Sequence, residues 1–335
     1  MISIFAPATL AVLLVASAQA VSPNPAQWIA QECTAPAGAF RVQPGGQYVS
    51  GYFGTLVADA LVRADQRTDL ALGWMRWYVA HAHDSGSGID GVPDDVDVIS
   101  GVEYSRGRPD STDAYGAVFL MLARDAYDGG DPALVSFIVS HRADLLRIMD
   151  SSIATVQPNG LTWSRPQHRI FYAIDNVQVY RGLLDAADLF RRAFGDNKTA
   201  TRYDEAAAKV KLGIDTVLWD PQTRSYRPYM NDLGTSGPAN LTQPYPDALA
   251  QVLAIYYGVV DPRSPIAADL VRRAAPALLL KDPLDEQRLI LLAAQERMGE
   301  HVVLPPFAPP SLCIDAAWYL DVLGRDTAGA QPAAR

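Results

Sequence analysis

The chain has 335 residues, which is long enough for one or two domains with a large buried core. Its formal net charge is −9, and no basic cluster interrupts this acidic balance, so a nucleic-acid partner is not expected. The same acidity leaves small neutral ligands open, because net charge governs long-range attraction rather than the recognition of an uncharged molecule.

Residues 1–20 have the pattern of a secretory signal peptide. An apolar core over residues 10–16 is followed by Ala18-Gln19-Ala20, a cleavage site of the A-x-A type, so we expect the mature chain to begin at Val21. Nothing later in the chain offers about 18 uninterrupted apolar residues, so no membrane anchor is expected. The sequence therefore predicts an exported protein, secreted or periplasmic, and we expect a monomer.

The chain contains 2 cysteines, Cys33 near the mature start and Cys313 near the end. An oxidising compartment allows them to pair, and such a bond would tie together the two ends of the fold. Two free, buried thiols are the alternative, and the sequence does not decide between them.

Apolar periodicity predicts helices along almost the whole mature chain. The expected helices span residues 24–30, 47–63, 69–83, 113–127, 133–153, 177–194, 199–218, 243–257, 266–280 and 285–298, with a last one from 313. Short strands are expected at 161–164 and 225–229, and a small hairpin at 96–104 lies within a loop over residues 84–112. Loops of that length inside a compact domain are usually functional. Residues 21–325 then form a single domain, and residues 326–335 form a disordered tail.

Asp110-Ser111-Thr112-Asp113-Ala114-Tyr115 ends the long loop and opens a helix that is apolar on nearly all sides. Such a helix must be enclosed by other helices, and carboxylates at its mouth are costly to bury unless they are solvated or hydrogen-bonded. One interpretation is that Asp110 or Ser111 caps the helix while Asp113 favours its positive end. The other interpretation is that Asp113 faces a substrate.

Helices that begin near residues 47, 113, 175, 247 and 315 recur at roughly 60 to 70 residues, and each except the last is followed by a second helix. If these helices form a parallel inner ring, their N-termini meet at one end, and long loops and carboxylates converge on a single cleft. The pattern predicts an all-α toroid of helical hairpins with short β-hairpins in its loops. Five units are visible, and the sixth is either completed by the N-terminal segment or missing.

This organisation resembles the six-hairpin, or (α/α)6-toroid, glycosidase superfamily. The similarity covers nearly the whole mature chain and includes three helix starts: Asp110–Tyr115, Tyr172-Ala173-Ile174-Asp175-Asn176 and Tyr245-Pro246-Asp247-Ala248. No single family within the superfamily is matched. The resemblance implies a carbohydrate cleft at the N-terminal ends of the inner helices, usually with acidic catalytic residues.

Glycoside hydrolysis requires one protonated carboxyl that donates to the leaving oxygen and an ionised one that acts as base or nucleophile. The first candidates are Asp113 and Asp175, with Asp110 third. Glu103, in the long loop, is a further candidate for the general acid, although loop carboxylates are more often only solvated. The identity of the acid depends on local burial and is left open. An inverting mechanism is favoured over a retaining one.

Aromatic rings present flat apolar surfaces on which sugar rings can stack, and sugar hydroxyls need directional polar partners. The expected substrate-binding residues are Tyr48, Tyr52, Tyr104, Trp163, Arg165, Tyr172, Tyr245 and Asp247. Asp247 and Asp315 are expected chiefly as helix caps, with a place in the cleft as the alternative. No cofactor and no metal are expected, since Asp94-Asp95-Val96-Asp97 lacks the spacing of a calcium loop and is interpreted as a solvated turn.

Two other functions stay open. A polysaccharide lyase needs a Tyr or His base near an arginine that neutralises a uronate, and Tyr172, His168 and Arg165 could supply that group. A toroid that binds carbohydrate without cleaving it would have lost its acid pair. Hydrolysis by carboxylate general acid and base catalysis is the first interpretation.

Overall fold

The computed structural model describes residues 23–83 and 86–328. The predicted signal peptide, residues 1–20, lies outside the described residues, as do residues 329–335 of the predicted tail. Residues 326–328 still belong to the last helix, so the predicted tail begins too early. No helix within the described residues is long and apolar enough to cross a membrane.

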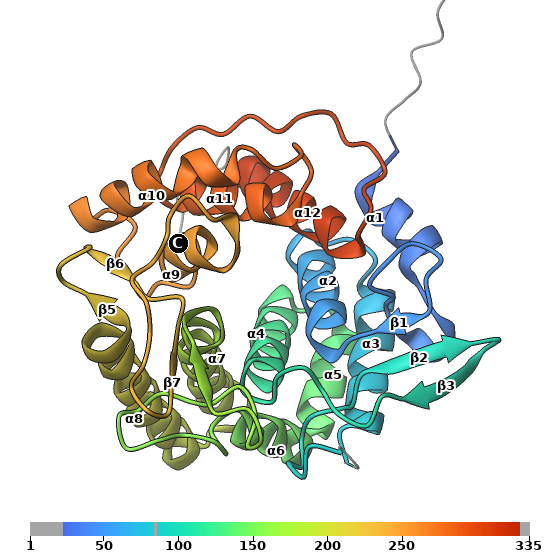
Figure 1. Cartoon of the computed structure of the whole chain (residues 1–335). Coiled ribbons are helices and arrows are strands. Elements are labelled where there is room, and N and C mark those ends of the chain that lie inside the picture. The colour runs from blue at the N-terminus through green and yellow to red at the C-terminus, as the bar shows by residue number, and fades with distance from the viewer. Residues whose placement is uncertain (1–22, 84–85, 329–335) are drawn as a thin grey trace, which may run out of the picture.

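A closed ring of helices forms the centre of the fold (Figure 1). Within the described chain the ring has six members: α2 (Gly51–Arg63), α4 (Asp113–Gly129), α7 (Ala173–Phe194), α9 (Leu249–Tyr256), α11 (Glu286–Arg297) and α12 (Cys313–Ala328). Each packs against the next in this order, and α12 packs against α2. The predicted toroid is confirmed and is complete, because α11 takes the sixth inner place that the sequence analysis left open.

A second layer of helices covers the outside of the ring. It contains α3 (Thr68–His81) against α2, α5 (Pro132–Ser140) and α6 (Arg142–Ser152) against α4, α8 (Asn197–Gly213) against α7, and α10 (Pro265–Leu278) against α9 and α11. Residues 300–310, after α11, have no regular secondary structure. The N-terminal segment, α1 (Pro25–Trp28) and η1 (Ile29–Cys33), packs on α12, so it completes the outer layer.

The ring is tight at α4 and α7, because α4 is apolar on nearly all sides and the two helices approach closely. Almost the whole of α4 is buried, from Asp113 to Ala123. At Gly182 on α7, an added Cβ would lie 2.6 Å from the Ala117 carbonyl oxygen on α4. Glycine at position 182 is therefore what allows the two helices to touch along their backbones.

Short strands lie within the loops that connect the helices, as expected. One antiparallel sheet contains β1 (Tyr48–Val49), β2 (Val96–Ile99) and β3 (Val102–Ser105), which confirms the hairpin predicted at 96–104. β4 (Ile170–Tyr172) pairs with β7 (Tyr229–Asn231), and β5 (Trp219–Asp220) pairs with β6 (Ser225–Tyr226). The strand predicted at 161–164 is instead a single bridge between Val156 and Thr162. β1 and β4 run directly into α2 and α7, so these strands fix the N-terminal ends of two inner helices.

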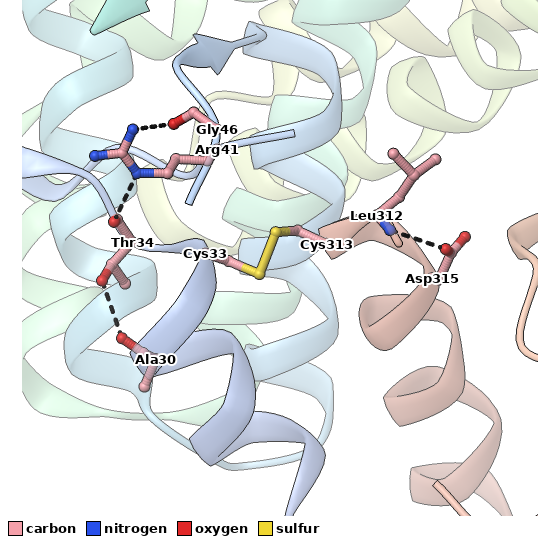
Figure 2. The surroundings of a disulfide bond; sticks show 8 residues. All are labelled: Ala30, Cys33, Thr34, Arg41, Gly46, Leu312, Cys313 and Asp315. Atoms are coloured by element: carbon pink, nitrogen blue, oxygen red, sulfur yellow. Dashed lines mark hydrogen bonds between the residues drawn. A yellow bond between two sulfur atoms is a disulfide. The ribbon is translucent and has the colours of Figure 1, made fainter. Parts of the chain in front are cut away.

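A disulfide bond joins Cys33 to Cys313 (Figure 2). Cys33 ends η1 and Cys313 begins α12, both are fully buried, and their Cα atoms are 5.9 Å apart. The Cys313 amide also donates to the Val42 carbonyl at 2.9 Å. The bond closes a loop with a sequence separation of 280 residues, so the two ends of the chain are linked beside the junction of α12 and α2.

We expect the double variant Cys33→Ser, Cys313→Ser to lose about 2–5 kcal/mol of unfolding free energy, because a bond that closes so long a loop restricts the unfolded chain. Urea denaturation of the oxidised protein and the variant measures the difference. A reducing agent should destabilise the native protein by a similar amount and leave the double variant unchanged. Equal stability of all samples would contradict a structural role for the bond.

Candidate functional site

The N-terminal ends of the inner helices surround a small pocket. Its volume is about 150 Å³, and every inner helix contributes at least one lining residue. Its polar lining residues are Asp110, Asp175, Glu286, Tyr48, Ser50, Tyr52, Ser111, Tyr115 and Tyr245. The cleft that the sequence analysis expected at this end of the ring is therefore present, and it gathers five of the residues predicted for it: Asp110, Asp175, Tyr48, Tyr52 and Tyr245.

Asp175 is the carboxyl with the strongest perturbation in this pocket. It lies in the first turn of α7 and is partly exposed to the pocket. Burial raises the pKa of Asp175 well above its usual value, and the negative charges of Asp113 and Asp110 raise it further. This shift favours the protonated form of the Asp175 carboxyl, which is the form that can donate a proton.

Asp110 lines the same pocket in a different environment. Its side chain is exposed at the rim, and its carboxylate accepts no hydrogen bond from the described residues, while its backbone amide donates to the Tyr115 Oη at 3.3 Å. A solvated carboxylate beside a buried, protonated one is the arrangement that divides the roles of base and acid between two like groups.

Asp113, the first catalytic candidate of the sequence analysis, lies beneath the pocket and does not line it. Its side chain is fully buried and accepts hydrogen bonds from Ser111 Oγ (2.6 Å), the Ala114 amide (2.9 Å) and Thr162 Oγ1 (2.6 Å). Burial raises the pKa of Asp113 to about 6, although these donors oppose the shift. The prediction of substrate contact is not supported by this placement, because three protein donors occupy the carboxylate.

Glu286 is a pocket residue that sequence reasoning missed. It stands in the first turn of α11, and burial raises its pKa to about 8. Its backbone amide donates to Asp315 Oδ1 at 2.9 Å, and Asp315 also accepts from the Leu312 amide at 3.2 Å, so the expected capping role of Asp315 is confirmed. Had the helix predicted at 285–298 been assigned to the inner ring, its acidic first residues would have made Glu286 a candidate.

The tyrosines of the pocket are held in place by buried polar partners. Tyr48 Oη donates to Asp95 Oδ2 at 2.7 Å, and Tyr115 Oη donates to Asp95 Oδ1 at 3.0 Å. Tyr52 Oη accepts from Gln178 Nε2 at 2.6 Å. Asp95 is 4% exposed, so the turn at residues 94–97 is a support for the pocket rather than a solvated turn. Among the described residues, no group of three or more His, Cys, Asp or Glu side chains is placed to hold a metal ion.

A second group of predicted residues lies beside the pocket without lining it. Tyr172 Oη is 3.1 Å from His168 Nε2, and Arg165 Nη1 donates to the Pro109 carbonyl at 3.4 Å. The Arg169 guanidinium lies over the Trp163 ring, 5.0 Å from its centroid. Burial raises the pKa of Tyr172, and the charges of Asp175 and Asp110 raise it further, which places Tyr172 within their electrostatic range. This group forms a wall next to the two carboxyls.

Three predicted residues lie away from the pocket. Glu103 is on β3, where its carboxylate accepts from Trp77 Nε1 at 2.8 Å and contacts His81 Nε2 at 2.6 Å. It therefore fastens the β2–β3 hairpin to α3. Tyr104 on the same strand is 53% exposed, and Asp247 in η4 (Pro244–Ala248) accepts from the Asn240 amide at 2.6 Å. Asp247 thus fastens the loop before η4, and the helix-capping role expected from the sequence is not seen in its hydrogen bonds.

A larger cavity of about 550 Å³ lies at the opposite end of the ring, near the C-terminal ends of the inner helices. Its charged groups are paired with one another: Arg63 contacts Asp59 at 2.9 Å and Asp321 at 3.1 Å, and Arg181 contacts Asp185 at 2.6 Å. Because arginines engage these carboxylates, the carboxyl cluster at the other end is the candidate for chemistry.

Comparisons with known proteins agree with this architecture. No protein-family model matches the chain, and no curated protein matches it. Among solved structures, a rhamnosidase from Klebsiella oxytoca with rhamnose bound is 14% identical with a TM-score of 0.55 over 83% of this chain, which spans 58% of that chain. A wild-type glycosidase is 13% identical with a TM-score of 0.66, covering 90% of this chain and 94% of its own.

An endoglucanase from Klebsiella pneumoniae, a family 8 glycosyl hydrolase, is 10% identical with a TM-score of 0.60, covering 90% of this chain and 98% of its own. These likenesses establish the fold. The chain has an (α/α)6-toroid fold, as the sequence predicted, and it resembles these glycosidases in fold.

The buried carboxyls predict an unusual dependence of stability on pH. Folding raises the pKa of Asp95, Asp113 and Asp315 to about 6, that of Asp59 to about 7 and that of Glu286 to about 8, in each case chiefly through burial. Such a group stabilises the fold fully below its unfolded pKa, near 4, and this contribution is lost as the pH rises through the folded pKa. We expect the unfolding free energy to fall between pH 4 and pH 8, by about 1.4 kcal/mol or more.

Urea denaturation at a series of pH values measures this slope, and Asp95→Asn should flatten it by removing one contributor. Asp196, whose pKa is lowered to about 2, acts in the opposite direction but only below pH 4. A stability that rises from pH 4 to pH 8 would show that the carboxyls are not buried as described.

Proposed function

We propose that this protein is an exported glycoside hydrolase that cleaves an oligo- or polysaccharide with inversion at the anomeric carbon. The observation that carries the proposal is the pair of carboxyls in one pocket, Asp175 protonated by its burial and Asp110 exposed at the rim. The fold supports the same conclusion, since the solved structures that resemble it include glycosidases.

In the proposed reaction Asp175 is the general acid and Asp110 the general base. Asp110 takes a proton from a water molecule, whose oxygen forms the new bond to the anomeric carbon. Asp175 gives its proton to the glycosidic oxygen as the bond between that oxygen and the anomeric carbon breaks. Both products leave neutral, and the two carboxyls exchange their protonation states, which solvent then restores.

Asp113 acts through Asp175 rather than on the substrate. Its negative charge is the largest electrostatic cause, after burial, of the raised pKa of Asp175. Ser111, which donates to Asp113 Oδ1 and also lowers the pKa of Asp175, lies between the two carboxyls and couples their positions. Asp113 is thus a positioning residue that keeps the general acid protonated.

The lyase alternative is supported by one contact, the 3.1 Å approach of Tyr172 Oη to His168 Nε2 beside Arg165. A lyase base must lose its proton near neutral pH, whereas burial and the neighbouring carboxyls raise the pKa of Tyr172. Products of a lyase carry an unsaturated sugar that absorbs ultraviolet light, so absorbance of the products separates the two reactions. A toroid that only binds carbohydrate would bind glycans and release no product.

We expect Asp175→Asn to reduce kcat by about 10²-fold or more, because it removes the donated proton. The melting temperature should change little, since the native carboxyl is already protonated and an amide has the same shape. Reducing-end assays on a panel of glycans measure the loss. Asp232→Asn is the matched control, an exposed carboxylate outside the pocket whose nearest partner is Arg169 at 3.9 Å.

Full activity of Asp175→Asn would contradict its role as the acid. If the native protein released an ultraviolet-absorbing product and Tyr172→Phe were inactive, the protein would be a lyase with Tyr172 as its base.

We expect Asp113→Asn to keep measurable activity and to move the alkaline limb of the pH profile of kcat/KM to lower pH, because the pKa of Asp175 falls when the neighbouring charge is removed. The unfolding free energy should also fall by about 1–3 kcal/mol, since an amide nitrogen cannot satisfy three donors as the carboxylate does. A complete loss of activity with an unchanged melting temperature would instead place Asp113 on the substrate.

A further inference from the structure

We propose that the pocket holds one terminal sugar ring that carries no anionic group, so that the protein releases single sugars from chain ends. The inference rests on the proposed hydrolase function and adds to it the mode of attack and the charge of the sugar.

The size of the pocket limits what it can enclose. Its volume of about 150 Å³ lies below the roughly 300–1,000 Å³ of most small-molecule sites. An apolar interior cavity of about 150 Å³ binds benzene, an unsubstituted six-membered ring, so a space of this size can enclose at most one sugar ring. One pyranose ring therefore fills the space beneath Asp110 and Tyr245, and the next sugar of a chain must lie outside it.

The pocket is also blind. Its floor is made of Leu56, Leu253, Ile290 and Trp318, none more than 9% exposed, which come from four different inner helices. Leu56 also lines the cavity at the opposite end of the ring, so these buried side chains separate the two spaces and a chain cannot pass through. Tyr245, which is 64% exposed, stands at the rim opposite this floor. A polysaccharide can enter such a pocket only by one of its ends.

The charge of the lining selects against anionic sugars. Among the described lining residues three are carboxylic, Asp110, Asp175 and Glu286, and none is Arg, Lys or His. Burial already raises the pKa of Asp175 and Glu286, so this pocket disfavours negative charge, and a uronate would place a further carboxylate beside Asp110 with no cation to neutralise it. Arg165, beside the pocket, is directed to the Pro109 carbonyl. The lining instead offers hydroxyls and carboxyls, which are partners for the hydroxyl groups of a neutral ring.

Glu286 is the specificity residue in this proposal. Its carboxyl lines the pocket, and among the described residues no side chain or amide hydrogen-bonds to it. It lies on α11, across the ring from Asp110, in the loop before α4, and from Asp175 on α7, so it faces a part of the sugar away from the bond that is cut. A ring hydroxyl can bond with Glu286, whereas an anionic substituent at the same place is repelled once Glu286 ionises.

The first test follows the products of the native protein on neutral oligosaccharides with a fluorescent label at one end. While most of the substrate is intact, each cut should release one single sugar and leave a chain that is one sugar shorter. Early fragments of two or more sugars on both sides of the cut would overturn the inference while leaving the hydrolase proposal in place. Tyr245→Ala opens the rim, so the share of longer fragments among its products should rise several-fold. Leu233→Ala, a control at an 84% exposed position in the loop before η4, should leave that share unchanged.

The second test does not depend on cleavage. Calorimetric titration of Asp175→Asn with glucose, galactose, mannose and rhamnose, and with glucuronate and galacturonate, should give tighter binding of at least one neutral sugar by 10-fold or more. Above pH 8, where the Glu286 carboxyl is ionised, adding Glu286→Gln should reduce the ratio of neutral-sugar to uronate affinity. Adding Glu300→Gln, an exposed control outside the pocket, should leave that ratio unchanged. Binding of uronates as tight as that of neutral sugars, or of no single sugar at all, would overturn the inference. Neutral-sugar binding without any cleavage by the native protein would refute the hydrolase alone.

Discussion

The constraint on which the rest of the structure depends is the closure of the inner ring. Helices such as α4 have no polar face, so they are stable only when other helices enclose them on every side. Close backbone contacts, such as that of Gly182 with Ala117, hold neighbouring members together, and the contact of α12 with α2 closes the circle. Because the members run parallel, closure brings all their N-termini to one end, and a pocket there follows from the packing.

The same geometry decides the protonation of the pocket. A helix N-terminus stabilises a carboxylate by about 0.3–1 kcal/mol, which lowers its pKa by less than one unit. Burial acts in the opposite direction and is larger: the pKa of Asp113 rises from 3.8 to about 6 even with three hydrogen-bond donors around it. Enclosure therefore outweighs the helix dipole, and an acidic group can remain protonated at a position where a solvated helix would ionise it.

The sequence predicted the toroid and the end at which the pocket lies because both follow from local patterns, apolar periodicity and aspartates at helix starts. The sequence did not distinguish the roles of Asp113 and Asp175, because both stand in the first turn of an inner helix. The difference arises because Thr162 and Ser111 hydrogen-bond to the Asp113 carboxylate. The sequence could not show that the side chains of Trp77 and His81 hydrogen-bond to the Glu103 carboxylate, because no sequence pattern links these two segments. Glu286 was missed because α11 has no aspartate beside an aromatic residue at its start, unlike the helices that defined the repeat.

The seam between α12 and α2 gives the molecule a definite order of assembly. Trp318 on α12 supplies part of the pocket floor, and Cys313 bonds to Cys33, which lies near the start of the described residues. During synthesis the first helices leave the ribosome long before α12 has been made. Until then they expose the apolar groove that α12 later fills. The pocket is completed only when α12 packs against the ring. A chain that ends before residue 313 would expose the apolar lining of the pocket as an aggregation-prone surface.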